Sequence, residues 1–175
     1  PEVTFREFRA KVLDGIKNFI NDYKIFSESE KEDIISQESS NQILISFFNN
    51  FRSKGLEHKI YILIDEYDHF TNELISFRLT EFKDIVSRNG YVRKFYEAIK
   101  EGTGSGIVDR FFATGVTPVT LDSLTSGFNI SSDMTTESVF NEMLGFTDEE
   151  VKQMLNYYKV EKSEEIMTDL RNLYN

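Results

Sequence analysis

The amino-acid sequence predicts an α/β fold in which helices flank a small parallel sheet. Over long stretches, apolar residues recur every three or four positions, as they do on one face of an α-helix. Between these stretches lie short apolar runs of strand length, at 60–64 and 110–115. Helices that alternate with buried strands are characteristic of α/β architecture.

Composition narrows the class of protein. The chain has 175 residues, of which 39% are apolar and 14% aromatic, enough to bury a core and to disfavour intrinsic disorder. Its net charge of −10 disfavours nucleic acid as a partner of this segment. The absence of cysteine excludes disulfides and thiol nucleophiles, and no apolar run approaches the ~20 residues of a membrane span. We therefore expect a cytoplasmic protein without a membrane partner.

The first third of the chain predicts two helices. Six apolar residues from Phe5 to Tyr23 follow one another at steps of three or four and predict a first helix. A second helix is predicted over 41–54, with Gly55 placed to end it. The polar stretch 27–41 between them is expected to be a mobile connection.

The pattern then changes to that of strands. The run 60–64 predicts a strand that is buried on both faces, as in a parallel sheet covered by helices. A helical region is expected over 80–100, then a glycine-rich loop over 101–106, and a second strand over 110–115. A third strand is expected over 139–145.

The C-terminal part predicts two helices. Thr147 and Glu150 have the spacing of a capping box, which marks a helix start. Ser163 is expected to cap a last helix that turns Ile166 and Leu170 inward.

Two adjacent carboxylates, Asp65 and Glu66, follow the strand 60–64 directly. Ligands of open α/β sheets bind at the carboxyl ends of the strands. There one carboxylate can hold Mg²⁺ beside a nucleotide phosphate, and the next can orient or deprotonate a water molecule. Asp68 either caps a following helix or joins the same acidic cluster at the cofactor site. Strands also end in Asp simply because Asp favours turns, but five apolar residues before Asp-Glu form the pattern of a Walker B strand.

The second strand ends in Thr114-Gly115, which can place the Thr114 hydroxyl near a phosphate or the attacking water. The alternative is an ordinary Thr-Gly turn. Arg110 is expected either to pair with Asp109 or Asp122 or to reach a phosphate. The glycines of 102–106 do not form a phosphate-binding loop, because they follow no strand and no Gly-Lys-Ser/Thr closes them.

With these residues, the chain resembles the AAA-like ATPase domain that often precedes a PD-(D/E)XK nuclease-like domain in bacteria. The matching words are YILIDEYD (61–68), RFFATGVTP (110–118), LDSLTSGFNIS (121–131), NEMLGFTDEEV (141–151) and IMTDLRNLYN (166–175). They cover most of the chain from about residue 43 onward.

The resemblance implies a P-loop NTPase-like (AAA/ASCE) parallel sheet of strand order 5-1-4-3-2. It makes Asp65 the Mg²⁺ ligand, Glu66 the catalytic glutamate and Thr114 the sensor-1 residue of a domain that binds and hydrolyses ATP. It also implies a partial ATPase core over 1–146 and the start of a helical lid over 147–175. Nucleic acid would be bound only through a downstream domain.

One departure from the family is large. The sequence contains no G-x-x-x-x-G-K-[ST] phosphate-binding loop, which the family places upstream of residue 1 together with a central strand. We therefore expect residues 1–175 to be inactive without that loop, and an exposed sheet edge to permit self-association. The alternative is a degenerate, non-hydrolysing switch or interaction module. A DNA-processing enzyme is disfavoured by the net charge and by the lack of a spaced Asp…Glu-x-Lys nuclease constellation on adjacent strands.

Overall fold

The computed structural model describes residues 2–69, 90–116, 130–140, 142–143 and 145–174. The chain divides into two compact units, Pro1–Ser131 and Ser132–Asn175. The lid boundary between residues 146 and 147 that the family resemblance implies stays a prediction.

Four helices make up more than half of the described residues of the first unit: α1 (Glu2–Tyr23), α2 (Glu28–Ile35), α3 (Ser40–Ser53) and α6 (Tyr91–Gly104). The predicted helices over 5–23 and 41–54 are confirmed as α1 and α3. Aromatic rings join them, since Phe19 of α1 packs edge-to-face on Phe47 of α3 at 5.1 Å between ring centroids. Gly55 follows α3 with φ +62°, the left-handed conformation that favours glycine.

The expected mobile connection over 27–41 is wrong, because this stretch contains α2. Ser27 and Glu30 form a capping box at the start of α2, and Ile34 is fully buried in the core. At the other end, the Arg9 guanidinium of α1 donates to the Gln37 carbonyl at 2.5 Å. The polar composition of this stretch predicted a connection, whereas the capping box and the buried Ile34 stabilise a helix.

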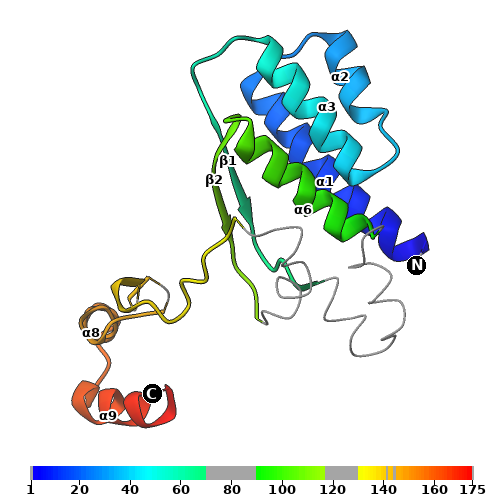
Figure 1. Ribbon diagram of the computed structural model, residues 1–175. Helices are drawn as coiled ribbons and strands as arrows, with labels where there is room; N and C mark the ends of the chain where they lie inside the picture. The colour runs from blue at the N-terminus through cyan, green and yellow to red at the C-terminus, as the bar shows by residue number, and fades with distance from the viewer. Residues whose placement is uncertain (1, 70–89, 117–129, 141, 144, 175) are drawn as a thin grey trace. The chain divides into compact units, whose positions relative to one another are not determined.

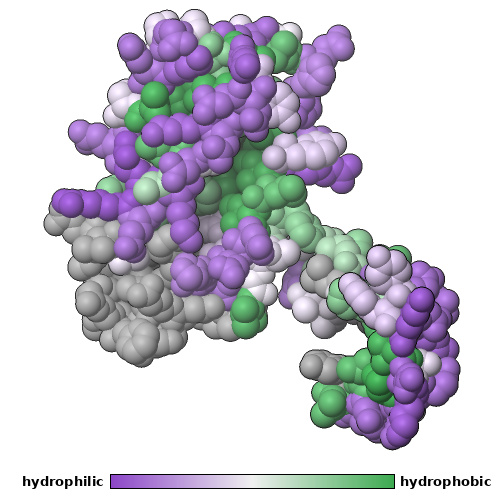
Figure 2. Space-filling view, turned by 180° about the vertical axis from the view of Figure 1, so that it is seen from behind, coloured by the Kyte–Doolittle hydropathy of each residue, from purple (hydrophilic) through white to green (hydrophobic). Residues whose placement is uncertain are grey.

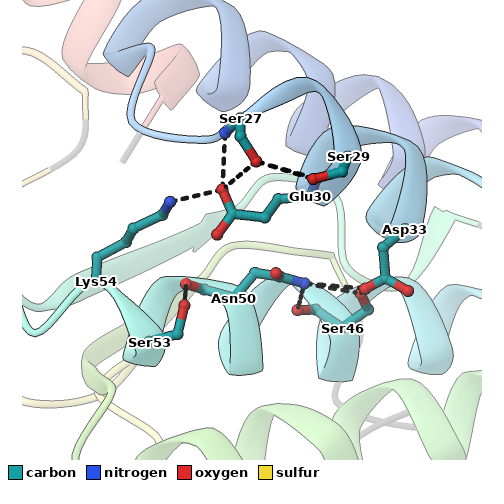
Figure 3. A network of polar contacts seen from close by, with 8 residues as sticks. All are labelled: Ser27, Ser29, Glu30, Asp33, Ser46, Asn50, Ser53 and Lys54. Carbon is teal, nitrogen blue, oxygen red and sulfur yellow. Dashed lines mark hydrogen bonds and ion pairs between the residues drawn. The ribbon is translucent and has the colours of Figure 1, made fainter.

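A polar network fastens α2 to α3 (Figure 3). The Lys54 ammonium lies 2.5 Å from a Glu30 carboxylate oxygen that also accepts the Ser27 backbone N–H at 2.7 Å. One turn further along α2, Asp33 accepts hydrogen bonds from Ser46 at 2.5 Å and Asn50 at 3.0 Å. These contacts fix the rotation of α2 on α3.

Two strands, β1 (Ile60–Ile64) and β2 (Val108–Ala113), pair in parallel. Ile62, Ile64 and Phe111 pack against the core of the helices, and Figure 1 shows α1, α3 and α6 together on one side of the strands. The expectation that the first strand is buried on both faces is wrong. Tyr61 and Leu63 are 63% and 76% exposed, since the helices of the described residues cover only the other face.

The predicted glycine-rich loop over 101–106 is also corrected. Helix α6 continues through Gly104, and Gly102 is buried against Phe48 and Val108. Only three residues connect the helix to β2, and Gly106 provides a positive φ of +72° there. The expected helical region over 80–100 is confirmed from Tyr91 onward, while residues 80–89 lie outside the described part.

The second unit contains a short 3-10 turn, η1 (Ser138–Phe140), and helices α8 (Asp148–Tyr157) and α9 (Ser163–Tyr174). The Thr147–Glu150 capping box is confirmed. The expected third strand over 139–145 is wrong, because its described residues form the 3-10 turn and bends. Met167 is buried, whereas Phe146, Tyr157 and Leu173 are exposed, and Figure 2 shows apolar surface on this unit.

Candidate functional site

The parallel register brings the two chemically interesting strand ends together. Ile64 of β1 lies opposite Ala113 of β2, so Asp65 and Thr114 are the next residues on neighbouring strands. Two backbone hydrogen bonds continue the ladder past the strands: Thr114 N–H donates to Ile64 O, and Tyr67 N–H donates to Thr114 O, both at 2.9 Å. The backbone thereby fixes the positions from which both side chains project.

Asp65 and Thr114 contact each other directly. The Thr114 hydroxyl donates a hydrogen bond to Oδ1 of Asp65, and the Glu66 backbone N–H donates to the same oxygen at 3.0 Å. Oδ2 of Asp65 has no hydrogen-bond partner among the described residues, and the side chain is exposed. Asp65 therefore presents one held oxygen and one oxygen open to a ligand.

Glu66 has an unusual backbone conformation. Its φ of +54° lies in the left-handed region, which costs a non-glycine residue about 1–2 kcal/mol. The turn that results lets the His69 N–H donate to the Glu66 carbonyl at 3.0 Å. The Glu66 side chain is 67% exposed, with its carboxylate 3.6 Å from Nδ1 of His69. Such outliers concentrate at functional sites, where the surrounding structure holds them.

Asp68 differs from Asp65 and Glu66 because its side chain is buried. It is 1% exposed, and its Oδ2 accepts the Val116 backbone N–H at 3.1 Å. Val116 follows Thr114 by two residues, so this bond links the turn after β1 to the segment after β2. Sequence reasoning left the role of Asp68 open and missed Gly115 and Val116 as its neighbours. The Thr-Gly pair at the strand end was the signal that pointed to this segment.

Arg110 forms an ion pair with its neighbour Asp109, with Nε to Oδ2 at 3.4 Å, and both side chains are exposed. This is one of the two pairings expected for it, while Asp122 lies outside the described residues. Among the described residues, no group of three or more His, Asp or Glu side chains could hold a metal ion. Within that part of the chain, a cation at the strand ends would therefore have few protein ligands.

None of the described helices combines the length and the apolar composition that crossing a membrane would require. A comparison with curated proteins gave no significant match, and a comparison with solved structures gave none either.

Comparison with protein families gave a match to the one described as "Predicted AAA-ATPase". The match covers residues 2–125, which include both strands, the acidic turn after β1 and Thr114. Because it spans more than half of the chain, the chain belongs to the predicted AAA-ATPase family.

Proposed function

We propose that the ends of β1 and β2 form part of an ATP-binding and ATP-hydrolysing site. In this proposal Asp65 binds Mg²⁺, Glu66 is the catalytic glutamate and Thr114 is the sensor-1 residue. The observation that supports it best is the hydrogen bond from the Thr114 hydroxyl to Asp65 across two neighbouring parallel strands. A nucleotide at this edge would meet all three side chains, as expected where ligands bind at the carboxyl ends of strands.

The donor set fits Mg²⁺ better than a metal that needs a protein cage. Magnesium keeps several waters and is held by one or two carboxylates together with substrate phosphates. Asp65 supplies one such carboxylate with an open oxygen, and no larger group of metal-binding side chains occurs in the described ranges. When bound, Mg²⁺ would neutralise charge that develops on the phosphate oxygens.

Each protein group then has a separate role. Thr114 and the Glu66 N–H hold Oδ1 of Asp65, which orients Oδ2 toward the cation. Glu66 is exposed and is free of any ion pair with Lys or Arg in the described residues, so its carboxylate can accept a proton from a water molecule. Glu66 has a positive φ and Asp65 does not, so the two adjacent side chains start from different backbone conformations.

The phosphates need a further group that this sequence does not contain. A phosphate-binding loop offers backbone N–H groups and a Lys, and no G-x-x-x-x-G-K-[ST] occurs in the 175 residues. With a net charge of −10 the chain by itself would repel free ATP. Activity in this proposal therefore depends on a phosphate-binding loop outside these residues. Nucleic acid would be engaged only through a nuclease-like domain downstream.

Substitution Glu66→Gln tests the catalytic assignment, in a chain that carries the phosphate-binding loop. We expect ATP to bind as in the wild type and turnover to fall at least about a hundredfold, the lower range for loss of a general base. Glu57→Gln is the control, because Glu57 is also exposed but precedes β1. Unchanged turnover in Glu66→Gln would remove Glu66 from the mechanism.

A second candidate is a non-hydrolysing interaction module that associates with a second copy through the sheet. The exposed side chains of Tyr61 and Leu63 favour it, because apolar sheet faces are usually covered. Two measurements separate the two candidates. The interaction module would form a dimer without nucleotide in light scattering and show no ATP turnover, whereas the wild-type ATPase would show turnover.

A further inference from the structure

Asp68 is a carboxylate buried within three residues of the exposed Asp65. Burying such a group is costly unless hydrogen bonds replace its lost water. One replacement is the Val116 N–H, which donates to Oδ2 at 3.1 Å. The acceptor is thus on the turn after β1, and the donor is on the backbone that follows Thr114. The bond closes a short loop around the Asp65–Thr114 contact.

Gly115 lies against the same carboxylate. A Cβ atom at this position would lie 2.5 and 2.7 Å from two ring carbons of Tyr67 and 2.8 Å from Oδ1 of Asp68. These distances are far below van der Waals contact, so no side chain fits without displacing Tyr67 or Asp68. Asp68 and Tyr67 therefore pack directly against the backbone at Gly115, where the absence of a side chain permits this close approach.

Helix α6 lies against β2, where the Tyr96 ring packs edge-to-face on Phe111 at 6.3 Å between ring centroids. Tyr96 is 2% exposed, and burial raises the pKa of its phenol, with further contributions from the neighbouring Tyr67 and Asp68. Helix α6 also packs against the core under both strands. Asp68 is thus buried in the fold and holds the β2 segment through the Val116 N–H.

We propose that Asp68 is a positioning residue, which fixes the Gly115–Val116 backbone so that the Thr114 hydroxyl stays on Asp65. This inference rests on the proposed function for the roles of Asp65 and Thr114. It gives the acidic residues after β1 different roles. Asp65 and Glu66 face the ligand, whereas Asp68 acts through the backbone of β2 and touches neither Mg²⁺ nor ATP.

The competing role for Asp68 is a second cofactor ligand, and two substitutions separate the roles. Asp68→Asn keeps an oxygen that can accept the Val116 N–H but loses the charge, whereas Asp68→Ala loses both. A positioning residue is largely rescued by Asn. A metal ligand needs the charge, so Asn would then be almost as harmful as Ala.

The first measurement is hydrogen exchange of the Val116 amide by NMR, which needs no activity. We expect exchange about tenfold faster or more in Asp68→Ala, the loss typical of a hydrogen bond to a charged group. Asp68→Asn should stay near the wild type, and Gly115→Ala, which pushes on Asp68, should also speed exchange. Asp33→Ala is the control: Asp33 accepts hydrogen bonds from Ser46 and Asn50 within the helices. Its loss should leave Val116 unchanged.

The second measurement is ATP turnover in a chain with a phosphate-binding loop. We expect kcat to fall about tenfold or more in Asp68→Ala with little change in KM, and to recover in Asp68→Asn. Unchanged Val116 exchange in Asp68→Ala, or equal loss of kcat in both variants, would overturn the inference. If Asp68→Ala does not fold, Gly115→Ala and Asp68→Asn give the same comparison. Absence of Mg²⁺–ATP binding in the wild type would refute the proposed function, while Val116 exchange would still test the positioning role.

Discussion

Gly102 offers the sharpest test of the packing between α6 and its neighbours. Replacing it with Ala would place a Cβ atom 2.8 Å from a ring carbon of Phe48 and 2.9 Å from a methyl carbon of Val108. Carbon atoms pack best at about 3.5–4.0 Å, so both contacts are too short by roughly 0.6–1.2 Å. Phe48 and Val108 are only 4% and 2% exposed, so neither can move into solvent.

The magnitude follows from two opposing terms. Overpacking a tight core costs about 1–3 kcal/mol, whereas Ala in place of Gly favours a helix by about 1 kcal/mol. With two rigid contacts we expect a net loss of about 1–2 kcal/mol in the free energy of unfolding. For a chain of this size that lowers the midpoint of thermal unfolding by about 2–8 °C.

Gly104→Ala is the matched control, because it lies in the same helix and its Cβ would meet nothing within 4 Å. Urea unfolding followed by circular dichroism measures both variants. Gly104→Ala should be neutral or slightly stabilising. Equal stability of the two variants would refute the close approach of α6 to Phe48 and Val108.

Two further predictions concern stability. The hydrogen bond from Lys54, with those from Ser27, lowers the pKa of Glu30 from 4.5 to about 2. A lowered folded-state pKa stabilises above the unfolded value and is lost on acidification, so the stability advantage of the wild type over Glu30→Gln should shrink between pH 4.5 and 2. Urea unfolding at pH 7 and pH 3 measures it, and an equal difference at both would contradict the assignment. In the second unit, Met167→Ala removes a side chain that is 2% exposed, a change that costs about 2–5 kcal/mol in a packed core. Amide exchange should then rise throughout α8 and α9, and unchanged exchange there would show that Met167 does not hold them together.

The sequence predicted the elements whose signals are local. Apolar periodicity identified α1 and α3, and the Thr147–Glu150 spacing identified the start of α8. Helix α2 was missed although Ser27 and Glu30 have the same capping-box spacing as Thr147 and Glu150. Only one of its side chains, Ile34, is buried, and polar contacts to another helix stabilise it, so it lacks the apolar periodicity that revealed the other helices.

At the candidate site, too, the sequence predicted only the features that have a local signal. An apolar run before Asp65 predicts a strand with a carboxylate at its end, and a parallel neighbour that ends at Thr114 puts the two side chains within reach. The sequence did not predict which face of β1 is buried. Tyr61 and Leu63 are exposed because burial depends on which face of the sheet the helices cover. The burial of Asp68 and the left-handed turn at Glu66 have no signal in the sequence either, since Glu is a residue that seldom adopts that conformation.

The proposed function depends above all on Asp65 holding Mg²⁺ beside a bound nucleotide. Calorimetric titration of ATP with and without Mg²⁺ is the decisive test, on wild type and Asp65→Ala chains that carry a phosphate-binding loop. We expect Mg²⁺ to tighten ATP binding to the wild type and this gain to disappear in Asp65→Ala. An equal gain from Mg²⁺ in both chains would contradict the role of Asp65.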